Sequence, residues 1–195
     1  MNAAWRDPCA LREVPAGPCE TRGMARRTGG RGKASAGATP AVTLLTRLAI
    51  PFTAHHYDHD PGVASFGREA ADELGVDPAR VFKTLVVDLS AGGGRGLGVT
   101  VLPVEGRLDL KAAGAAFGVK KVALADSAAA ERSSGYVVGG ISPLGQRTVL
   151  PTVLEETALL HDTIHVSGGA RGFDVELAPT DLVAALSATT APLLR

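Results

Sequence analysis

The 195-residue chain is 45% apolar and carries 20 basic and 20 acidic residues, so its formal net charge is zero. This length and composition suit one globular domain with a tail. The charges are spread unevenly: residues 1–38 hold seven Lys or Arg and three acids, which leaves a net charge of −4 for residues 39–195. That mildly acidic body excludes a global positive field that would attract nucleic acid, so any RNA contact must come from a local patch.

Residues 1–38 are rich in Gly, Ala, Arg and Pro and show no periodicity, so we expect a disordered basic extension. It could be a solvated tail, a basic RNA-binding arm, or the product of a mis-assigned start codon, since Met24 begins a plausible shorter chain. Both cysteines, Cys9 and Cys19, lie in this extension, which excludes a disulfide framework, a cysteine metal site and a cysteine nucleophile from residues 39–195.

No apolar run approaches the roughly 20 residues that a membrane span needs. The N-terminus also lacks the apolar core of a signal peptide. We therefore expect a cytoplasmic protein that does not bind a membrane.

The folded part begins at Thr39, which we expect to cap a helix with Pro40 at its first position and Pro51 beyond its end. The elements that follow in chain order are a strand over 52–57, a helix over 65–75, a short helical turn opened by Asp77, a central strand over 81–89, and a partner strand over 97–103. The later elements are a helix capped by Asp109, a short strand over 120–125, a helix capped by Asp126, a hairpin of 163–169 with 172–179, and a final helix capped by Thr180. This irregular alternation favours a mixed α/β sheet over a regular parallel βαβ series.

Three familiar motifs fail on their spacing. The glycine run at 92–98 does not give G-x-G-x-x-G and precedes a strand, so we interpret it as a hairpin loop. The segment 140–145 is similar to a nucleophile elbow, but Leu144 stands where glycine is needed, which disfavours Ser142 as a hydrolase nucleophile. Residues 55–60, HHYDHD, lack a zinc-ligand spacing, so histidines that face solvent or make local hydrogen bonds are the favoured interpretation over a metal site.

Two charged residues interrupt apolar strands. Lys83 is either an edge residue whose ammonium group reaches solvent or a cation at the mouth of a pocket, and the strand alone leaves both open. Asp174 shares a strand face with Glu176, and a plain solvent face is the favoured interpretation of that pair.

Two segments are rich in glycine, GGISPLG at 139–145 and VSGGARG at 166–172. Glycine lets a backbone approach a ligand closely, and proline fixes the shape of the loop. The two segments could form two walls of one pocket, suited to holding a small polar group or a developing oxyanion, or they could be ordinary tight turns.

Seven blocks of residues 39–195 follow one another without large gaps and together carry a specific pattern: TPAVTLL, YDHDP, VFKTLVV, LDLKAAGAAFGVKKV, ERSSGYVVGGISPLGQ, LPT and VSGGARGFDVELA. The pattern resembles the bacterial YbaK/EbsC family of Cys-tRNA(Pro) deacylases, in the superfamily of prolyl-tRNA synthetase editing domains. The resemblance implies an α/β fold with a mixed, barrel-like curled sheet, flanking helices and a pocket at its mouth. The deacylase domain would span residues 39–195.

The superfamily's G-x-x-x-P element falls on residues 139–143 and its pocket lysine on Lys83. The resemblance implies that Lys83, Gly139 and Gly140 take part in catalysis. It also implies a set of substrate-binding residues: Tyr57, Phe66, Ile141, Ser142, Pro143, Ser167, Gly169 and Asp174.

The implied reaction is cleavage of the ester between a mischarged cysteine and the 3′ end of proline tRNA. The family looks like one in which the thiol of the bound cysteine attacks its own carbonyl, with no protein nucleophile, metal or cofactor. The implied partners are mischarged tRNA(Pro) and prolyl-tRNA synthetase in a ternary complex, with no DNA. A deacylase for another small amino acid, such as Ala-tRNA(Pro), and a non-catalytic tRNA- or synthetase-binding adaptor remain open.

Overall fold

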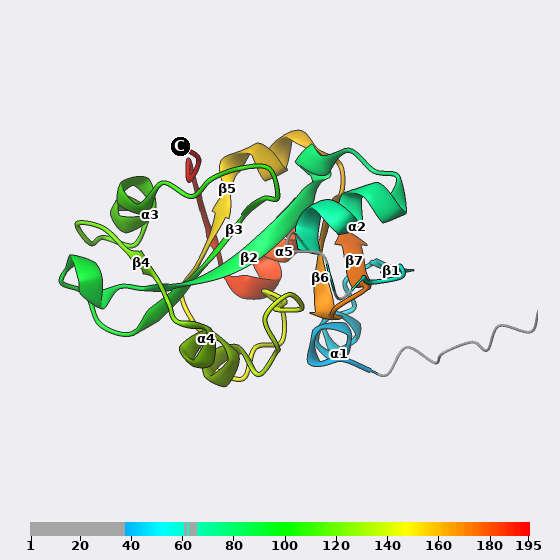
Figure 1. Ribbon diagram of the computed structural model, residues 1–195, viewed down its shortest axis with the longest axis horizontal. Coiled ribbons are helices and arrows are strands. Elements are labelled where there is room, and N and C mark those ends of the chain that lie inside the picture. The colour runs from blue at the N-terminus through cyan, green and yellow to red at the C-terminus, as the bar shows by residue number, and fades with distance from the viewer. Residues whose placement is uncertain (1–37, 61, 63–65) are drawn as a thin grey trace, which may run out of the picture. The chain divides into compact units, whose positions relative to one another are not determined.

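The computed structural model describes residues 38–60, 62 and 66–195 (Figure 1). The disordered extension expected over residues 1–38 lies outside the described residues apart from Ala38, as do Met24 and both cysteines. The first described element, α1, begins two residues after Ala38.

Eight strands of the described residues form one mixed sheet, in the spatial order β1-β7-β6-β2-β3-β5-β8, with β4 paired to β2. Their bounds are Thr53–His56 (β1), Val81–Asp88 (β2), Leu97–Pro103 (β3), Ala123–Leu124 (β4), Thr152–Glu155 (β5), Ile164–Ala170 (β6), Phe173–Leu177 (β7) and Thr189–Ala191 (β8). β2 is antiparallel to β3 and β4 but parallel to β6, and β3 is parallel to β5. This pattern confirms the expected mixed α/β fold, a curled sheet flanked by helices, and the strand path runs open from β1 to β8.

The α-helices flank this sheet (Figure 1). Their bounds are Pro40–Arg47 (α1), Phe66–Leu74 (α2), Leu110–Ala116 (α3), Ser127–Ser134 (α4) and Pro179–Leu186 (α5). Three short 3-10 helices lie at Pro78–Arg80 (η1), Ser90–Gly92 (η2) and Glu156–Leu160 (η3).

Polar caps begin most of these helices where the sequence predicts them. The Thr39 hydroxyl accepts the Val42 N–H at 3.2 Å and also donates to the Gly168 carbonyl at 2.6 Å, which ties the start of α1 to β6. Asp109 and Asp126 cap α3 and α4 with their carboxylates. These three predicted caps are confirmed.

Two expectations about the C-terminal half are wrong or incomplete. Thr180 does not cap α5, because the helix begins at Pro179 and its N-cap residue, Ala178, offers no side-chain hydrogen bond. Proline at the first helical position fixes the start one residue earlier than the hydroxyl suggested. The sequence analysis also missed β5 and β8, which are short and pair in parallel with strands distant in the chain.

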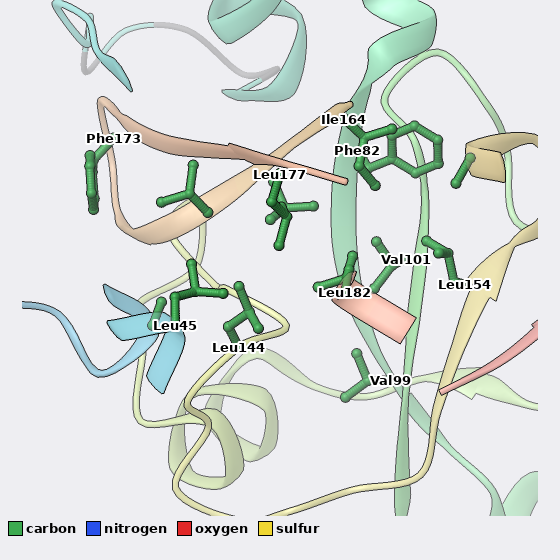
Figure 2. Close-up of a cluster of buried hydrophobic side chains, with 14 residues drawn as sticks. Leu45, Phe82, Val99, Val101, Leu144, Leu154, Ile164, Phe173, Leu177 and Leu182 are labelled. Carbon is green, nitrogen blue, oxygen red and sulfur yellow. The ribbon is translucent and has the colours of Figure 1, made fainter. Parts of the chain in front are cut away.

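β2 is the central strand, and its two faces have different environments. Phe82 on one face joins the main hydrophobic core with side chains of β3, β5, β6 and β7. Figure 2 shows this cluster, in which Leu45 of α1 and Leu182 of α5 pack on the same side as Phe82. The core therefore lies between this face of the sheet and helices α1 and α5.

The opposite face of β2 carries Val81, Lys83, Leu85 and Val87. Val81 packs with Ala70 and Ala71 of α2, whereas Val87 belongs to a separate apolar cluster that includes Ala113 of α3. Lys83 lies along β2 between Val81 and Val87 and belongs to neither of these two small clusters.

None of the helices in the described ranges combines the length and the apolar composition that crossing a membrane requires.

Leu144 anchors the glycine-rich segment 139–145 in the main core, where its side chain is fully buried. We expect Leu144→Ala to lower the free energy of unfolding by about 2–5 kcal/mol, because it leaves a cavity among well-packed neighbours. Urea unfolding measures this loss. Leu160→Ala is the matched control, since Leu160 is 81% exposed, and an equal effect of both substitutions would contradict the role of Leu144.

Candidate active site

A cavity of about 390 Å³ lies against the face of the sheet that carries Lys83. Side chains of α2 and α4, the loop before residue 142, and strands β2, β6 and β7 surround it. This volume lies within the range of small-molecule sites, roughly 300–1,000 Å³. The residues expected from the sequence to form the site and found in its lining are Tyr57, Phe66, Lys83, Gly139, Ile141, Ser167 and Asp174.

Lys83 is a half-buried cation on the central strand β2. β2 pairs with β3 from Phe82 to Asp88, but with β6 only at Val81 and Phe82, so Lys83 lies where β2 has a strand partner on one side only. Its place in the cavity lining favours the interpretation as a cation of a pocket. Its ammonium group donates to the carbonyls of Val104 at 2.9 Å and Gly106 at 2.7 Å. Burial lowers the pKa of the amine. Because an ammonium group has three donors, one N–H remains for a ligand in the cavity.

Asp174 is a buried carboxyl group, and the expectation of a plain solvent face is wrong for it. The residue is 5% exposed, and on β7 it lies opposite Ser167 of β6 and His55 of β1. Burial raises the pKa of its carboxyl group to about 6, and the nearby His55 opposes that rise. The cavity therefore contains an acid that is ionised at neutral pH and protonated in mild acid.

Tyr57 follows β1 and supplies a phenol to the same cavity. Its backbone N–H donates to the Gly172 carbonyl at 3.0 Å, which fixes the residue against the β6–β7 hairpin. Burial raises the pKa of the phenol, and the charge of Asp174 raises it further. The hydroxyl group therefore stays protonated and can donate a hydrogen bond to a ligand.

The loop at residues 137–141 forms one wall of the cavity. Its turn is closed by the Gly140 N–H donating to the Val137 carbonyl at 3.0 Å, and Gly139 has a φ of 90°. A Cβ on Gly139 would lie 3.0 Å from the ring of Phe66. Among the described residues, the N–H groups of Gly139 and Ile141 have no hydrogen-bond acceptor. Two donors at the cavity wall are the pattern that stabilises a developing oxyanion.

Arg171, which the sequence analysis did not single out, fastens the two glycine-rich segments together. Its Nε and Nη2 donate to the Val138 carbonyl at 3.0 and 2.7 Å. Its guanidinium carbon lies 5.1 Å from the centre of the Phe66 ring, within reach of a cation–π interaction. The only sequence signal was a charged side chain inside a segment of small residues.

The remaining expected site residues are Gly140, Ser142, Pro143 and Gly169, and they lie outside the cavity lining. Ser142 is fully buried, and its Oγ accepts the Leu144 N–H at 3.2 Å. A nucleophile must reach the substrate, so the esterase alternative for Ser142 is wrong. Gly140 packs against the backbone of Ala170, and Gly169 packs against the ring of Tyr136, so these residues hold the loops in place.

The histidines of the HHYDHD segment contact other protein side chains. His55 Nε2 lies 2.9 Å from Glu176 Oε2, and His59 Nδ1 lies 2.8 Å from Glu69 Oε2. The ring of His56 stacks on Phe173 with 4.5 Å between centroids. Only the bond of His59 is to a residue near in sequence, whereas His55 and His56 contact β7, more than 110 residues away.

His55, His165 and Glu176 nevertheless form a group whose ligand atoms lie within 4.8 Å of one another. Glu176 is already engaged, because its Oε1 accepts from Thr163 at 2.6 Å and from Arg80 at 3.0 Å. The hydrogen bond from Thr163, and after it the one with His55, lower the pKa of Glu176 to about 2 against the opposing effect of burial. A metal ion bound here would meet the Arg80 cation, so the group is better described as a hydrogen-bonded cluster that supports β7.

Residues 60–185 match the family described as the aminoacyl-tRNA editing domain. The chain is 36% identical over 141 residues to the proposed Cys-tRNA(Pro)/Cys-tRNA(Cys) deacylase EbsC of Enterococcus faecalis, an alignment that covers 72% of this chain and 84% of that protein.

Two solved structures are similar to this fold. One is the crystal structure of a proposed trans-editing enzyme for prolyl-tRNA synthetase, with a TM-score of 0.64 and 25% identity over 74% of this chain and 87% of that one. The other is a hypothetical protein with a TM-score of 0.71 and 24% identity, covering 80% of this chain and all of that one. The second likeness concerns the fold alone.

The raised pKa of Asp174 has a consequence for stability. A carboxyl group whose pKa is higher in the folded than in the unfolded state opposes folding above both values and has no such effect below them. A rise from 3.8 to about 6 corresponds to about 3 kcal/mol.

We therefore expect Asp174→Asn to be more stable relative to wild type at pH 7.5 than at pH 3.5, by up to about 3 kcal/mol. Urea unfolding of both proteins at the two pH values measures the difference. A stability difference that is the same at both pH values would show that Asp174 is not a desolvated acid.

Proposed function

Because this chain belongs to the aminoacyl-tRNA editing-domain family, we propose that it is a trans-editing deacylase that removes cysteine from Cys-tRNA(Pro). The observation that carries the proposal is the cavity of about 390 Å³, which is lined by a lysine, a buried aspartate and two loop residues, Gly139 and Ile141, whose N–H groups have no acceptor among the described residues. No nucleophilic side chain is needed, because an aminoacyl ester is already activated. Editing in the cytoplasm, where tRNA is charged, is the setting we propose.

In the proposed mechanism, the sulfur of the bound cysteine attacks its own carbonyl carbon. The C–O bond to the tRNA breaks, the thiol proton passes to the leaving 3′ oxygen, and the products are tRNA and a cyclic thiolactone. The N–H groups of Gly139 and Ile141 stabilise the oxyanion of the tetrahedral intermediate.

The cavity's charged and polar side chains would position the substrate. Lys83 has one N–H left after its two carbonyl acceptors, and we assign it to a phosphate or ribose oxygen of the terminal adenosine. Asp174, ionised at neutral pH, pairs with the ammonium group of the amino acid. Tyr57 donates from the side of β1 and limits the width of the cavity.

Editing is needed because cysteine and proline are close in size. A pocket that relies on shape separates ligands that differ by one methylene only about 10–200-fold. A second enzyme whose chemistry uses the thiol itself adds a criterion that shape cannot supply.

The alternatives make different demands on the cavity. A deacylase for Ala-tRNA(Pro) would use the same wall but would need water as the nucleophile. A non-catalytic adaptor would need neither free N–H donors nor a desolvated lysine, so the presence of both favours an enzyme. We also propose prolyl-tRNA synthetase as the partner that delivers the tRNA, since a net charge of −4 on residues 39–195 predicts weak RNA binding by the body alone.

We expect Lys83→Ala to lower kcat/KM for Cys-tRNA(Pro) by about 100–1,000-fold, the usual cost of losing a charge-stabilising donor. The fold should remain, because Lys83 is half-buried and lies between two apolar clusters that persist without it. Deacylation of radiolabelled Cys-tRNA(Pro) and thermal unfolding measure the two effects. Arg47→Ala, an exposed cation on α1, is the control, and a fully active Lys83→Ala protein would remove the role assigned to the lysine.

The thiol-assisted mechanism predicts a difference between two substrates. We expect wild-type protein to release cysteine from Cys-tRNA(Pro) much faster than alanine from Ala-tRNA(Pro), and the first product to be a thiolactone detectable by mass spectrometry. Equal rates would mean that the thiol is not essential and that the wall activates water. Release of neither amino acid, even with prolyl-tRNA synthetase present, would favour the adaptor.

A further inference from the structure

Lysine is rare in the folded part of this chain. Residues 39–195 contain only Lys83, Lys111, Lys120 and Lys121, and the other basic residues there are arginines. Lys83 lies in the candidate active site. The other three line a second, open hollow together with Ala91, Gly92 and Gly93, and we call them the lysine cluster.

Among the described residues, no carboxylate forms an ion pair with the lysine cluster. All three side chains are exposed, and within the described ranges none of their ammonium groups lies within 4.0 Å of a carboxylate. The neighbouring carboxylate, Asp109, caps α3: its Oδ1 accepts the N–H groups of Lys111 and Ala112 at 2.8 and 3.0 Å. These bonds, and after them the charges of Arg195 and Lys111, lower the pKa of Asp109. On an otherwise acidic body, these three charges form a local basic patch.

The backbone beneath the lysine cluster is held by close packing. A Cβ on Gly114 of α3 would lie 2.5 Å from the Cα of Lys121, and one on Gly92 would lie 2.7 Å from its backbone nitrogen. The Lys120 N–H donates to the Gly92 carbonyl at 3.3 Å. Only glycine permits this approach, so α3 and the loop after β2 fix the backbone from which Lys120 and Lys121 extend.

The lysine cluster lies near the rim of the first cavity, at Leu124, which pairs with Val87 four residues along β2 from Lys83. Lys121 precedes Leu124, which lines the first cavity, by three residues. Three residues of extended chain span at most about 11 Å between Cα atoms. A stacked nucleic-acid strand advances roughly 3.4 Å per nucleotide, so about three nucleotides cover the same distance.

We propose that the lysine cluster binds the sugar–phosphate backbone of the RNA whose 3′ end enters the first cavity. This inference rests on the proposed function, because it takes aminoacyl-tRNA as the substrate. Lysine suits the task, since a flexible point charge neutralises phosphates without reading bases. The cluster would therefore supply affinity that is independent of tRNA sequence and would leave the choice of amino acid to the cavity.

The test compares three proteins made as the full chain. The first is wild type, the second carries K111Q, K120Q and K121Q, and the third is a control with R47Q, R132Q and R147Q. The control removes the same charge from exposed arginines that line neither hollow. Binding of uncharged tRNA(Pro) is measured between 50 and 200 mM salt (about the range over which phosphate contacts are distinguished), and deacylation kinetics are measured at one salt concentration.

We expect the lysine variant to lose about tenfold or more in tRNA affinity at low salt. The slope of log K against log salt should flatten by about 2, since each contact with single-stranded phosphate contributes about 0.7. For deacylation, KM should rise while kcat stays unchanged, because no member of the cluster touches the cavity. A variant with arginine at all three positions should recover wild-type binding.

An unchanged slope in the lysine variant, or an equal loss in the arginine control, would overturn the inference. A loss that occurs only when prolyl-tRNA synthetase is present would also overturn it and would assign the cluster to an acidic protein surface. Because the binding measurement uses uncharged tRNA, it is independent of the reaction. Absence of deacylation in wild type, with the expected binding loss, would reject the proposed function and retain the RNA contact.

Discussion

One strand, β2, has to close the hydrophobic core with one face and hold an ammonium group against a cavity with the other. On the core face, Phe82 packs in one cluster with side chains of α1 and α5 (Figure 2). The other face would leave Lys83 desolvated without a partner if the chain after β3 did not turn back to present the carbonyls of Val104 and Gly106. Those two neutral acceptors orient the cation without cancelling its charge, which a carboxylate partner would do.

The same face carries a second unfavourable group. Asp174 is held in a site that raises its pKa to about 6, and no cation of the described residues lies within 4.0 Å of it. The free energy lost by burying this acid must be offset by the main core, which includes its β7 neighbours Phe173 and Val175. Alternation along one strand thus puts a stabilising residue and a functional residue side by side.

The sequence was sufficient to predict those elements that begin with a capping side chain or end in a glycine turn. Thr39, Asp109 and Asp126 marked the starts of three helices, and the glycine turn between β2 and β3 fixed an antiparallel pair. β5 and β8 carried no such signal, because their register depends on parallel partners far away in the chain. At the start of α5, Pro179 takes the first helical position, so the predicted cap Thr180 lies inside the helix.

For the candidate site, family resemblance located the residue types, and tertiary contacts decided which of them reach the cavity. Ser142 and Gly139 belong to one short motif, yet one is fully buried and the other lines the wall. Asp174 looked like a surface acid because its strand alternates polar and apolar residues, a pattern that does not distinguish solvent from a polar cavity. Arg171 could not be found from a pattern, since its role depends on Val138 and Phe66, which lie far from it in sequence.

The contact between Arg171 and Val138 holds the cavity wall by an interaction that differs from those that stabilise the fold. The cavity wall is held partly by an exposed guanidinium group, whereas the sheet is held by buried leucines and valines. Exposed contacts open locally at a lower free energy than the core. On warming, we therefore expect the wall to loosen while the fold is still intact, so that the proposed deacylation would lose its selectivity for the amino acid before the chain unfolds.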